Sequence, residues 1–406
     1  MATAARKSVI VTFKKKDQRP DKTRDKREIV METISSLVSF FDAGHMARGE
    51  SIPPDLEAEK IGYDVNEYEA PIVIASLTEE EIADLKENGN VAKVEDDGLC
   101  YALAGELSSS QILIEGQPTL LAETIPAGVA QIKAHLAWDC SRGKAVKVGV
   151  LDTGIDSGHP DLASNYRGGI SFVAGETSPM DYNGHGTHCA GTIAAAINGS
   201  GVVGVAPAAY LYAVKVLSAS GSGNWSWLIA GIDWCIKNGV KILSMSLGGG
   251  SAPSALEAMC NAAWSKGLLL VAAAGNSGGP VGFPARYSSV IAVSAIDNAN
   301  QIAGFSSRGP EVELCAPGVN VLSTVPGGGY RTLNGTSMAC PHVSGAAALA
   351  WGSHRYTNNV TIRRLLAWTA DNLGIPGRDP LFGFGRVDVE QASAAFTVPP
   401  AIPGIP

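Results

Sequence analysis

The protein has 406 residues, of which 45% are hydrophobic and 17% charged, and its formal net charge is −8. This acidic composition lacks the basic stripe of a nucleic-acid-binding protein, and the length suggests two or three globular domains. Its apolar runs are much shorter than the roughly 18 residues that a membrane-spanning helix needs, so we expect neither nucleic acid nor a membrane as a partner.

Residues 1–103 form a first, charge-rich domain in which strand-like and helix-like segments alternate. Residues 27–41 have apolar side chains at helical spacing, and Thr78 with Glu81 fits a capping box that opens a second helix. Short apolar runs indicate strands at 8–13, 70–75, 91–94 and 99–103. The order β-α-β-α-β-β predicts a small α+β sandwich of the ferredoxin-like kind, and residues 104–121 have the composition of a connector.

Residues 122–395 form a second, larger domain that is rich in glycine, alanine, serine and valine. Strands that alternate with helices indicate an α/β fold with a mostly parallel central sheet covered on both faces. Strands are predicted at 145–151, 210–217, 241–246 and 268–274, and helices near 186–197, 226–237, 253–265 and 338–351. Residues 396–406 are rich in proline, and we expect them to be a disordered tail.

Three short segments of the larger domain combine a reactive side chain with small neighbours. Asp152 ends a predicted strand, His185 lies in NGHGTHCAG at 183–191, and Ser337 lies in NGTSMACP at 334–341. A serine hydroxyl becomes an effective nucleophile when a histidine takes its proton, and a carboxylate can orient that histidine. The histidine and serine segments open predicted helices, whose free N–H groups favour a developing oxyanion.

Each of these residues alone also has a structural interpretation. A strand-end aspartate often caps a helix, a histidine in a glycine-rich turn is commonly a hydrogen-bonding scaffold, and a serine at a helix start is commonly an N-cap. Their joint occurrence favours catalysis. An α/β-hydrolase esterase is disfavoured, because that fold needs G-x-S-x-G and the chain order serine, acid, histidine.

The three segments resemble the signatures of the subtilisin family of serine proteases, and the similarity extends through nearly all of the larger domain. The resemblance implies a three-layer α/β/α fold and a serine endopeptidase, with Asp152 as the orienting carboxylate, His185 as the base and Ser337 as the nucleophile. It implies that Asn276 is the side-chain donor of the oxyanion hole and that His188 is structural. The alternative from another class is a non-catalytic binding module with a protease fold, against which the intact reactive set speaks.

The resemblance also implies a cleft that binds an extended peptide as an added strand. Two segments would form its walls, and three small residues would line the pocket for the side chain before the cleaved bond (the P1 side chain). Such an uncharged pocket should accept large apolar or aromatic side chains, with broad specificity. The wall residues are Gly221, Ser222, Gly223, Ser246, Leu247 and Gly248, and the pocket residues are Ala273, Gly275 and Gly282.

Two cation sites follow from the same resemblance, and we expect Ca²⁺ as the cofactor. Calcium binds several oxygen ligands at once, many of them backbone carbonyls. A plain Asn-Gly turn is the structural alternative for the tight site, and glutamate stands at one position where the family commonly has glutamine. The tight site would use carbonyls of Ala196, Ser200 and Val202, the Asn198 side chain, and the carboxylates of Asp161 and Glu123. A weaker cation site would use the carbonyls of Ala285, Tyr287 and Val290 with Glu313.

Residues 1–103 resemble the propeptide of the same family, an intramolecular inhibitor and folding helper, so the protein is expected to be made as a zymogen. The segment through Leu103 would then lie in the cleft as a product. We expect the first cut after Leu103, because presenting Leu121 instead would require a flexible connector to be ordered. A permanent accessory domain is the alternative. The mature enzyme is expected to be a monomer that acts on polypeptides.

The seven cysteines are an odd number, so at least one has no partner within the chain. Cys189 and Cys340 follow His185 and Ser337 on helices that begin at the same site, so the two thiols are expected to lie near each other. We expect small buried core residues, with a disulfide between these two as the alternative. A propeptide indicates secretion, with the signal absent from this sequence. The odd cysteine number and the missing signal favour the alternative, a cytoplasmic enzyme.

Overall fold

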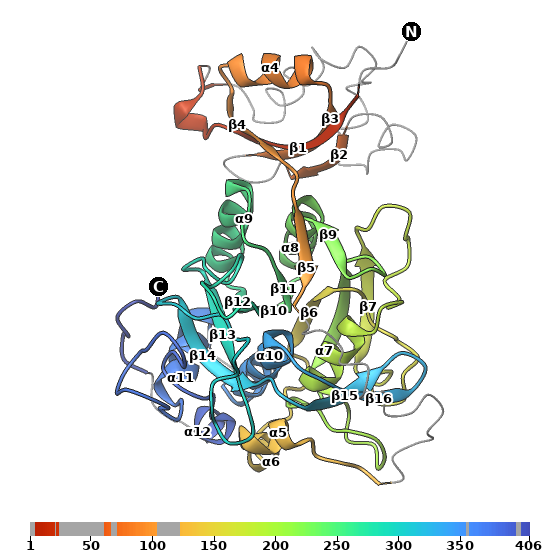
Figure 1. The fold of residues 1–406 in the computed structure, drawn as a ribbon, viewed down its shortest axis with the longest axis vertical. Coiled ribbons are helices and arrows are strands. Elements are labelled where there is room, and N and C mark those ends of the chain that lie inside the picture. The colour runs from red at the N-terminus through yellow and green to blue at the C-terminus, as the bar shows by residue number, and fades with distance from the viewer. Residues whose placement is uncertain are drawn as a thin grey trace. The chain divides into compact units, whose positions relative to one another are not determined.

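The computed structural model describes residues 5–20, 22–23, 61–65, 71–103, 122–354, 357–394 and 399–406 (Figure 1). The chain divides into two compact units. The first comprises Met1–Gly98 with Pro253–Ala258, and the second comprises Leu99–Ala252 with Met259–Pro406. Among the described residues, no helix is both long enough and apolar enough to cross a membrane.

An antiparallel sheet and one helix make up most of the described part of the first unit. The strand order is β2-β3-β1-β4, and β1 pairs antiparallel with both β3 and β4. The small α+β fold is therefore confirmed, while the helix predicted at 27–41 lies outside the described residues. The bounds are β1 Lys7–Phe13, β2 Ile61–Val65, β3 Ile72–Leu77, β4 Val91–Asp96, the 3-10 helix η1 Lys16–Gln18 and α4 Glu79–Glu87.

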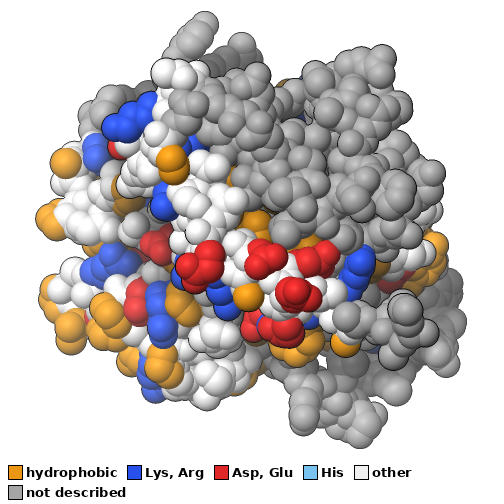
Figure 2. All heavy atoms as spheres, turned by 90° about the horizontal axis from the view of Figure 1, so that it is seen from above, with side chains coloured by type: hydrophobic (Ala, Val, Ile, Leu, Met, Phe, Trp, Pro, Cys, Tyr) orange, Lys and Arg blue, Asp and Glu red, His pale blue; other side chains and the backbone are white. Residues whose placement is uncertain are grey.

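Helix α4 begins with the predicted capping box. The Thr78 hydroxyl accepts a hydrogen bond from the Glu81 N–H at 3.3 Å, and the Glu81 carboxylate accepts one from the Thr78 N–H at 2.9 Å. The buried Ile82 and Leu85 side chains anchor the helix to the core of the sheet. Acidic residues in the first turn complement the positive end of the helix dipole, and the face that carries α4 is visibly acidic (Figure 2).

A parallel sheet of seven strands forms the centre of the second unit, in the order β14-β13-β12-β10-β6-β8-β7. The predicted α/β class is confirmed. The sequence patterns predict β6, β8, β10 and β12 but not the other three strands. The bounds are β6 Lys147–Asp152, β7 Tyr166–Ser171, β8 Tyr210–Lys215, β10 Ile242–Met245, β12 Leu269–Ala273, β13 Val290–Ile296 and β14 Val312–Pro317.

The predicted helices of the second unit are present, and they are joined by shorter ones and by the hairpin of β15 (Val321–Val325) and β16 (Gly329–Leu333). The long helices are α7 His185–Ala194, α8 Trp225–Lys237, α9 Ser254–Ser265, α10 Thr336–Ser353 and α11 Asn359–Trp368. The short ones are α5 Ala127–Gln131, α6 Ala134–Ala137 and α12 Val389–Ala394.

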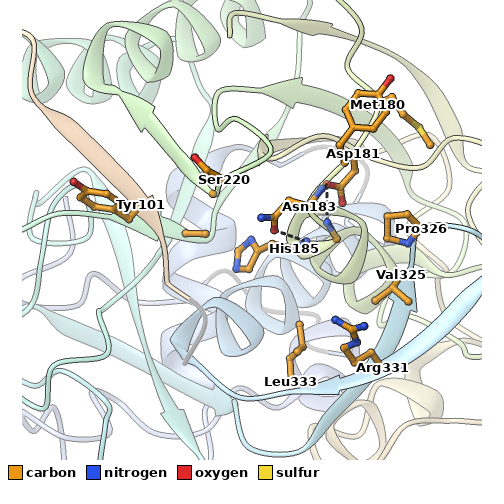
Figure 3. A pocket seen from close by; sticks show the side chains of 14 residues that line it. Tyr101, Met180, Asp181, Asn183, His185, Ser220, Val325, Pro326, Arg331 and Leu333 are labelled. Atoms are coloured by element: carbon orange, nitrogen blue, oxygen red, sulfur yellow. Dashed lines mark hydrogen bonds between the residues drawn. The ribbon is translucent and has the colours of Figure 1, made fainter. Parts of the chain in front are cut away.

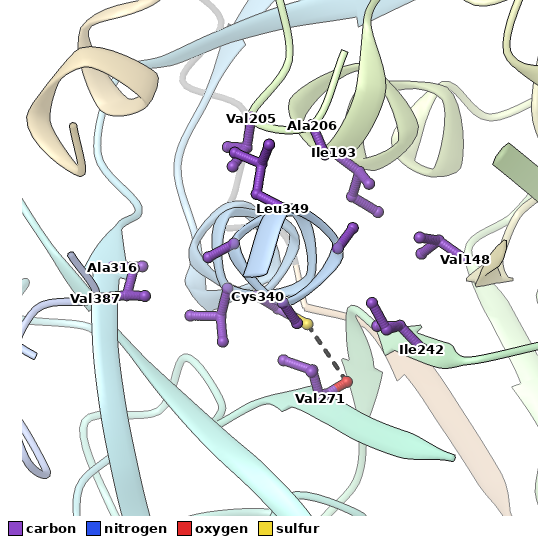
Figure 4. Packing of buried hydrophobic residues seen from close by; sticks show 14 of the residues in the cluster. Val148, Ile193, Val205, Ala206, Ile242, Val271, Ala316, Cys340, Leu349 and Val387 are labelled. Atoms are coloured by element: carbon purple, nitrogen blue, oxygen red, sulfur yellow. Dashed lines mark hydrogen bonds between the residues drawn. The ribbon is translucent and has the colours of Figure 1, made fainter. Parts of the chain in front are cut away.

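Helix α10 lies in the middle of the hydrophobic core (Figure 4). Every residue from Thr336 to Trp351 is buried, and the helix contains no Lys, Arg, Asp or Glu. A helix that is apolar on all sides is a buried helix, and its many alanines let the strands come close. Cys340 donates its Sγ–H to the Val271 carbonyl at 3.5 Å, which ties the helix to β12. The core therefore fixes the first turn of α10 relative to the sheet.

Strand β5 (Leu99–Ala102) differs from its predicted place as the last strand of the small domain's sandwich. It lies between β11 (Leu247–Gly248) and β9 (Ser222–Asn224) in the second unit and pairs antiparallel with both. The side chains of β5 alternate as in a strand with one buried face, since Cys100 is buried while Leu99 and Tyr101 are about half exposed. The segment just before the connector therefore belongs structurally to the larger unit.

Two further expectations are settled by the second unit. The seven cysteines all lie among the described residues and none is in a disulfide, so Cys189 and Cys340 are not bonded to each other; only Cys140 is exposed. The end of the chain was expected to be disordered, yet residues 399–406 pack on the domain. Ile405 is buried, and Arg378 Nη1 donates to the Gly404 carbonyl at 3.5 Å. Proline prevents helix or strand there but does not prevent an irregular segment from packing.

Candidate active site

Asp152, His185 and Ser337 come from three elements whose ends meet at one edge of the parallel sheet. Asp152 is the last residue of β6, where functional groups of such sheets gather. His185 opens α7 directly after Gly184, and Ser337 is the second residue of α10, after Gly335. Both glycines have positive φ, +104° and +149°, which few other residues adopt. The glycine-rich sequences thus position the His185 and Ser337 side chains.

The Asp152 carboxylate orients the His185 ring. Asp152 Oδ1 accepts a hydrogen bond from His185 Nδ1 at 2.7 Å, and it also accepts the Thr153 N–H at 2.7 Å. Burial by itself would lower the pKa of His185, but the neighbouring Asp152 charge outweighs it and the pKa is raised well above its usual value. The carboxylate therefore leaves Nε2 as the free ring nitrogen and stabilises the protonated ring.

The Ser337 hydroxyl is turned away from the base. Its Oγ donates to the Ser246 carbonyl at 2.9 Å, and His185 Nε2 has no hydrogen-bond partner among the described residues. Ser337 must rotate about its Cα–Cβ bond before Nε2 can accept its proton. Catalytic hydrogen bonds commonly form only when the reacting complex is assembled.

Asn276 holds a donor over the carbonyl of Leu103. Its Oδ1 accepts hydrogen bonds from the Thr336 N–H at 2.9 Å and from Thr336 Oγ1 at 2.8 Å. These two bonds fix the orientation of the amide, so that Nδ2 faces the site and donates to the Leu103 carbonyl oxygen. An amide donor held over a peptide carbonyl is the arrangement expected of an oxyanion hole.

The chain's own β5 lies in the cleft as an added strand. The Ala102 N–H donates to the Gly221 carbonyl at 2.9 Å, and the Leu103 N–H donates to the Ser246 carbonyl at 3.2 Å. On β11, Leu247 pairs with Ala102 and Gly248 with Tyr101. On β9, Ser222 pairs with Tyr101, Gly223 with Cys100 and Asn224 with Leu99. The structure thus brings all six predicted wall residues against an extended peptide.

The Leu103 side chain lies beside Gly248. A Cβ added to Gly248 would lie 2.6 Å from the Phe283 carbonyl oxygen and 3.2 Å from Leu103 Cδ1, so the backbone contact requires glycine and the leucine fits closely against it. Leu103 packs on the core cluster that includes Ala273. Gly275 donates its N–H to Thr336 Oγ1 at 3.2 Å, and the Gly282 N–H donates to the Ala274 carbonyl at 2.9 Å. The three predicted pocket residues are therefore tied to the strand end and loop that border the site.

Asp181, which was not predicted from the sequence, organises the turn before His185. Its buried carboxylate accepts five hydrogen bonds, from the Thr153 hydroxyl, the N–H groups of Asn183 and Gly184, and the N–H and hydroxyl of Thr187. An aspartate two residues before Asn-Gly is the sequence signal that could have indicated this turn-forming role.

His188 has the structural role that the resemblance implied. Its Nε2 lies 3.0 Å from the carbonyl oxygens of both Val321 and Arg331. Burial lowers the pKa of His188 to about 3, so the ring is neutral and its N–H donates to these carbonyls. His188 therefore holds α7 against the β15–β16 hairpin.

The residues predicted for the tight calcium site lie together. Asp161 is buried, and its Oδ2 accepts hydrogen bonds from the Val202 N–H at 2.9 Å and from the Tyr330 hydroxyl at 3.0 Å. Asn198 Nδ2 donates to Asp161 Oδ1 at 2.9 Å. Glu123 Oε1 accepts the N–H groups of Asn198 and Gly199 at 2.6 and 2.9 Å. The loop from Ala196 to Val202, which includes Ser200, therefore wraps around two carboxylates and an amide.

At the predicted weaker cation site, an arginine lies against the carboxylate. Arg363 Nε donates to Glu313 Oε1 at 2.8 Å and Nη2 to Oε2 at 2.6 Å, and both side chains are buried. The same guanidinium donates to the carbonyls of Ser288 and Val290 at 2.8 and 3.3 Å. Both oxygens of Glu313 and one expected carbonyl ligand thus already have a cationic partner. Ala285 and Tyr287 lie on the turn just before Val290.

A buried aspartate–histidine pair, a nearby serine and an amide donor facing the site are the arrangement of a serine hydrolase. A strand paired into the cleft is how such an enzyme binds an extended peptide. A model of the Subtilase family matches residues 143–385, more than half of the chain, so the chain belongs to the subtilase family. It is a subtilisin-type serine endopeptidase that acts on polypeptides.

Several characterised relatives are similar over most of their length. Subtilisin E of Bacillus subtilis (strain 168) is 46% identical over 326 residues, which are 79% of this chain and 80% of that protein. The subtilisin of Bacillus pumilus is 50% identical over 279 residues, 67% of this chain and 100% of that protein. The M-protease of Shouchella clausii (strain KSM-K16) is 42% identical over 372 residues, 91% of this chain and 90% of that protein.

Proposed function

We propose that this endopeptidase cleaves after large apolar residues through an acyl-enzyme on Ser337, and that the first such bond it cleaves is its own Leu103–Ala104 bond. The observation that carries the proposal is the Leu103 carbonyl, which accepts a hydrogen bond from Asn276 beside the nucleophile while β5 is paired on both edges.

The proton transfers follow from the four side chains. His185 Nε2 takes the proton of Ser337 Oγ as the oxygen attacks the substrate carbonyl carbon. The resulting oxyanion accepts hydrogen bonds from Asn276 Nδ2 and from the Ser337 N–H at the start of α10. The imidazolium, stabilised by Asp152, then protonates the departing amine, and the carbon–nitrogen bond breaks. Water attacks the acyl-enzyme with the same base and releases the acid.

Specificity before the cleaved bond rests on the pocket that receives Leu103. Ala273, Gly275 and Gly282 are small and uncharged, so a charged P1 side chain would be buried without a partner there. An apolar P1 side chain gains transfer free energy, about 25 cal/mol for each Å² buried. The strand pairs of the cleft use backbone atoms, which explains broad specificity at the other positions.

The position of β5 supports a propeptide for residues 1–103 and a first cut after Leu103. The Leu103 carbonyl already accepts a hydrogen bond from Asn276, whereas bringing Leu121 to the same place would mean ordering an 18-residue connector, 104–121, at about 1–2 kcal/mol per residue. After the cut, β5 would remain as a bound product and inhibit the enzyme. N-terminal sequencing of the earliest processed species tests this. A new terminus at Ala104 supports the proposal, and a terminus at Ala122 with no earlier intermediate rejects it.

The loop at 196–202 fits a bound Ca²⁺. Two carboxylates, an amide oxygen and a run of backbone carbonyls match the hard oxygen ligands that calcium prefers. Glu123, Asp161, Asn198 and the carbonyls of Ala196, Ser200 and Val202 would hold the ion, which would supply loop stabilisation and no part of the hydrolysis. The weaker cation site at Ala285, Tyr287, Val290 and Glu313 stays a prediction, in which a cation would compete with Arg363.

Labelling with a serine-directed fluorophosphonate tests the catalytic proposal. The processed protein should be labelled on Ser337 and should hydrolyse a p-nitroanilide that ends in Tyr-Ala-Leu. Ser337→Ala should do neither and should remain an uncut precursor. A folded protein that neither processes itself nor takes the label would instead indicate the non-catalytic binding module. We propose that the enzyme is secreted, because a cell needs to keep an exported protease inhibited by a propeptide until its release. We further propose that the mature enzyme is a monomer.

A further inference from the structure

A cavity of about 750 Å³ runs past the catalytic base (Figure 3). Tyr101, Ala102, Ser220 and Gly221 lie at the end occupied by β5. The opposite walls are formed by the segment from Met180 to His185 and by Val325, Pro326, Arg331 and Leu333 of the β15–β16 hairpin. The cavity therefore extends from β5 past His185 to the β15–β16 hairpin.

The direction of proton transfer in peptide hydrolysis indicates which part of a substrate enters the cavity beyond His185. Residues before the cleaved bond lie along β9 and β11, as β5 does, and end at the Leu103 carbonyl. His185 must reach the nitrogen on the other side of the bond to protonate it. The residues after the bond therefore begin beside His185 and extend between Asn183 and the hairpin residues Leu333 and Arg331.

Arg331 is the one Lys or Arg among the residues that line the cavity. Figure 3 shows its guanidinium turned toward the open space. Within the described part of the chain, the guanidinium has no ion-pair or hydrogen-bond partner. The one acidic lining residue, Asp181, is 1% exposed, and five donors already bind its oxygens. The wall facing the leaving part of a substrate thus presents an uncompensated positive charge.

The backbone under Arg331 is rigid although its side chain is free. The Arg331 carbonyl accepts a hydrogen bond from His188 Nε2 at 3.0 Å, and Arg331 pairs with Ser323 across the hairpin. Arg331 and Leu333 are two residues apart on one strand, so they face the same side at a spacing of about 7 Å. An extended substrate advances about 3.3 Å per residue. With Leu333 beside the first residue after the bond, Arg331 lies opposite the third, and its long side chain can also reach the second.

We propose that Arg331 selects substrates with an acidic side chain at the second or third position after the cleaved bond. This inference rests on the proposed function, because it assumes that the bond after the Leu103 position is the one cleaved. The chain's own sequence fits the preference: Ala104, Gly105 and Glu106 follow Leu103, so the first acid stands at the third position. Arginine binds carboxylates well because its planar guanidinium can donate two parallel hydrogen bonds.

The test uses internally quenched peptides with Tyr-Ala-Leu before the bond and alanines after it. One Glu, or one Gln of similar size, is placed at each of the first three positions after the bond. We expect a kcat/KM for Glu about two- to fivefold above Gln at the second or third position, the range of a partly exposed ion pair. The preference should shrink as the salt concentration rises. Equal rates for Glu and Gln at both positions would overturn the proposal.

Variants of Arg331 test whether its guanidinium causes the preference for Glu over Gln. Arg331→Ala should bring the Glu/Gln ratio to about one, Arg331→Lys should keep part of it, and Arg331→Glu should invert it in favour of Lys-containing peptides. Arg167→Ala, at an exposed arginine that does not line the cavity, is the matched control and should keep the ratio. If the Glu/Gln ratio of kcat/KM is unchanged in Arg331→Ala, another residue causes the preference and the proposal is rejected.

A second readout separates this inference from the proposed function. The Tyr-Ala-Leu p-nitroanilide has no residues after the cleaved bond, so Arg331→Ala should hydrolyse it at the rate of the unchanged enzyme. If the unchanged enzyme fails on this substrate, the proposed function fails. If Arg331→Ala alone loses this activity, Arg331 acts through the structure of the hairpin and the specificity assignment is wrong.

Discussion

Ser246 and Ser337 are joined by two hydrogen bonds, in each of which one hydroxyl donates to the other residue's carbonyl at 2.9 Å. The Ser337 carbonyl needs a side-chain partner because Pro341, four residues later in α10, has no N–H to donate to it. Cys189 Sγ adds a weaker bond to the same oxygen at 3.5 Å. When the Ser337 hydroxyl turns toward His185, the bond from Ser246 Oγ still anchors the start of α10.

Replacing Ser246 by alanine should therefore destabilise the fold. The buried Ser337 carbonyl loses its stronger partner, so the free energy of unfolding should fall by about 1–3 kcal/mol. Urea unfolding in a Ser337→Ala background, which prevents self-digestion and keeps the carbonyl, measures this. Ser164→Ala at an exposed position is the control and should change stability by less than about 0.5 kcal/mol. Similar losses in the two variants would contradict the assigned role.

Removing the amide of Asn276 should slow catalysis with little effect on substrate binding. In Asn276→Ala, kcat should fall by about 10²–10³, the loss known for the equivalent donor of subtilisin, because that donor acts mainly on the oxyanion. Steady-state kinetics on the p-nitroanilide separates kcat from KM. A variant that raises KM at unchanged kcat would show that Asn276 binds substrate rather than the transition state.

The pH profile should reflect the raised pKa of His185. The base works only when neutral, so kcat/KM should be low in acid and should rise with pH through a midpoint above the ordinary histidine value of about 6.5. In Asp152→Asn the charge that raises the pKa is gone, so the midpoint should move to lower pH and the rate should fall by roughly 10⁴. A midpoint that stays unchanged in Asp152→Asn would contradict this electrostatic account.

Calcium removal should lower the melting temperature if the 196–202 loop binds the ion. An ion that binds only the folded state stabilises it by about 2.7 kcal/mol at a hundredfold excess over its Kd. Thermal unfolding of Ser337→Ala with and without a chelator measures the effect, and Asp161→Asn should abolish it. Asp139→Asn, at an exposed acid outside the loop, should keep the full response. A melting curve that is insensitive to chelation would reject the site.

Breaking the Glu313–Arg363 pair should be strongly destabilising. Arg363→Met leaves a buried carboxylate without its counter-ion and should lower the free energy of unfolding by about 3–5 kcal/mol. The double variant Glu313→Leu/Arg363→Met should recover most of that loss. If the predicted weaker cation site exists, added Ca²⁺ should stabilise Arg363→Met more than the unchanged protein. No difference between the two would reject that site.

The central strands and the catalytic segments were predictable because their signals are local. β6, β10 and β12 are short apolar runs, and the glycines before His185 and Ser337 indicate the turns that expose both side chains. β7 and β14 lack such signals, since β7 contains Gly168 and Gly169 and β14 contains Glu313. The carboxylate of Glu313 can be buried only because Arg363 arrives from a distant helix, and no local pattern predicts that partner.

The side-chain geometry of the site was beyond sequence reasoning for the same reason. The motifs predict that Ser337 and His185 lie close together, but the Ser337 hydroxyl is directed by the Ser246 carbonyl, which belongs to another segment. Arg331 shows no motif, and its place on the cavity wall depends on the pairing of β15 with β16. Contacts between distant segments decide these features.

The burial of α10 links the enzyme's activity to the completion of its own folding. The helix that carries Ser337 is surrounded by apolar side chains of the core, including Val271, Val205 and Ile193 (Figure 4). A chain whose sheet has not yet closed around α10 has no fixed nucleophile, and so it cannot digest its neighbours while they are equally unfolded and vulnerable. Formation of the core therefore limits proteolysis during biosynthesis, before any inhibitory strand is in place.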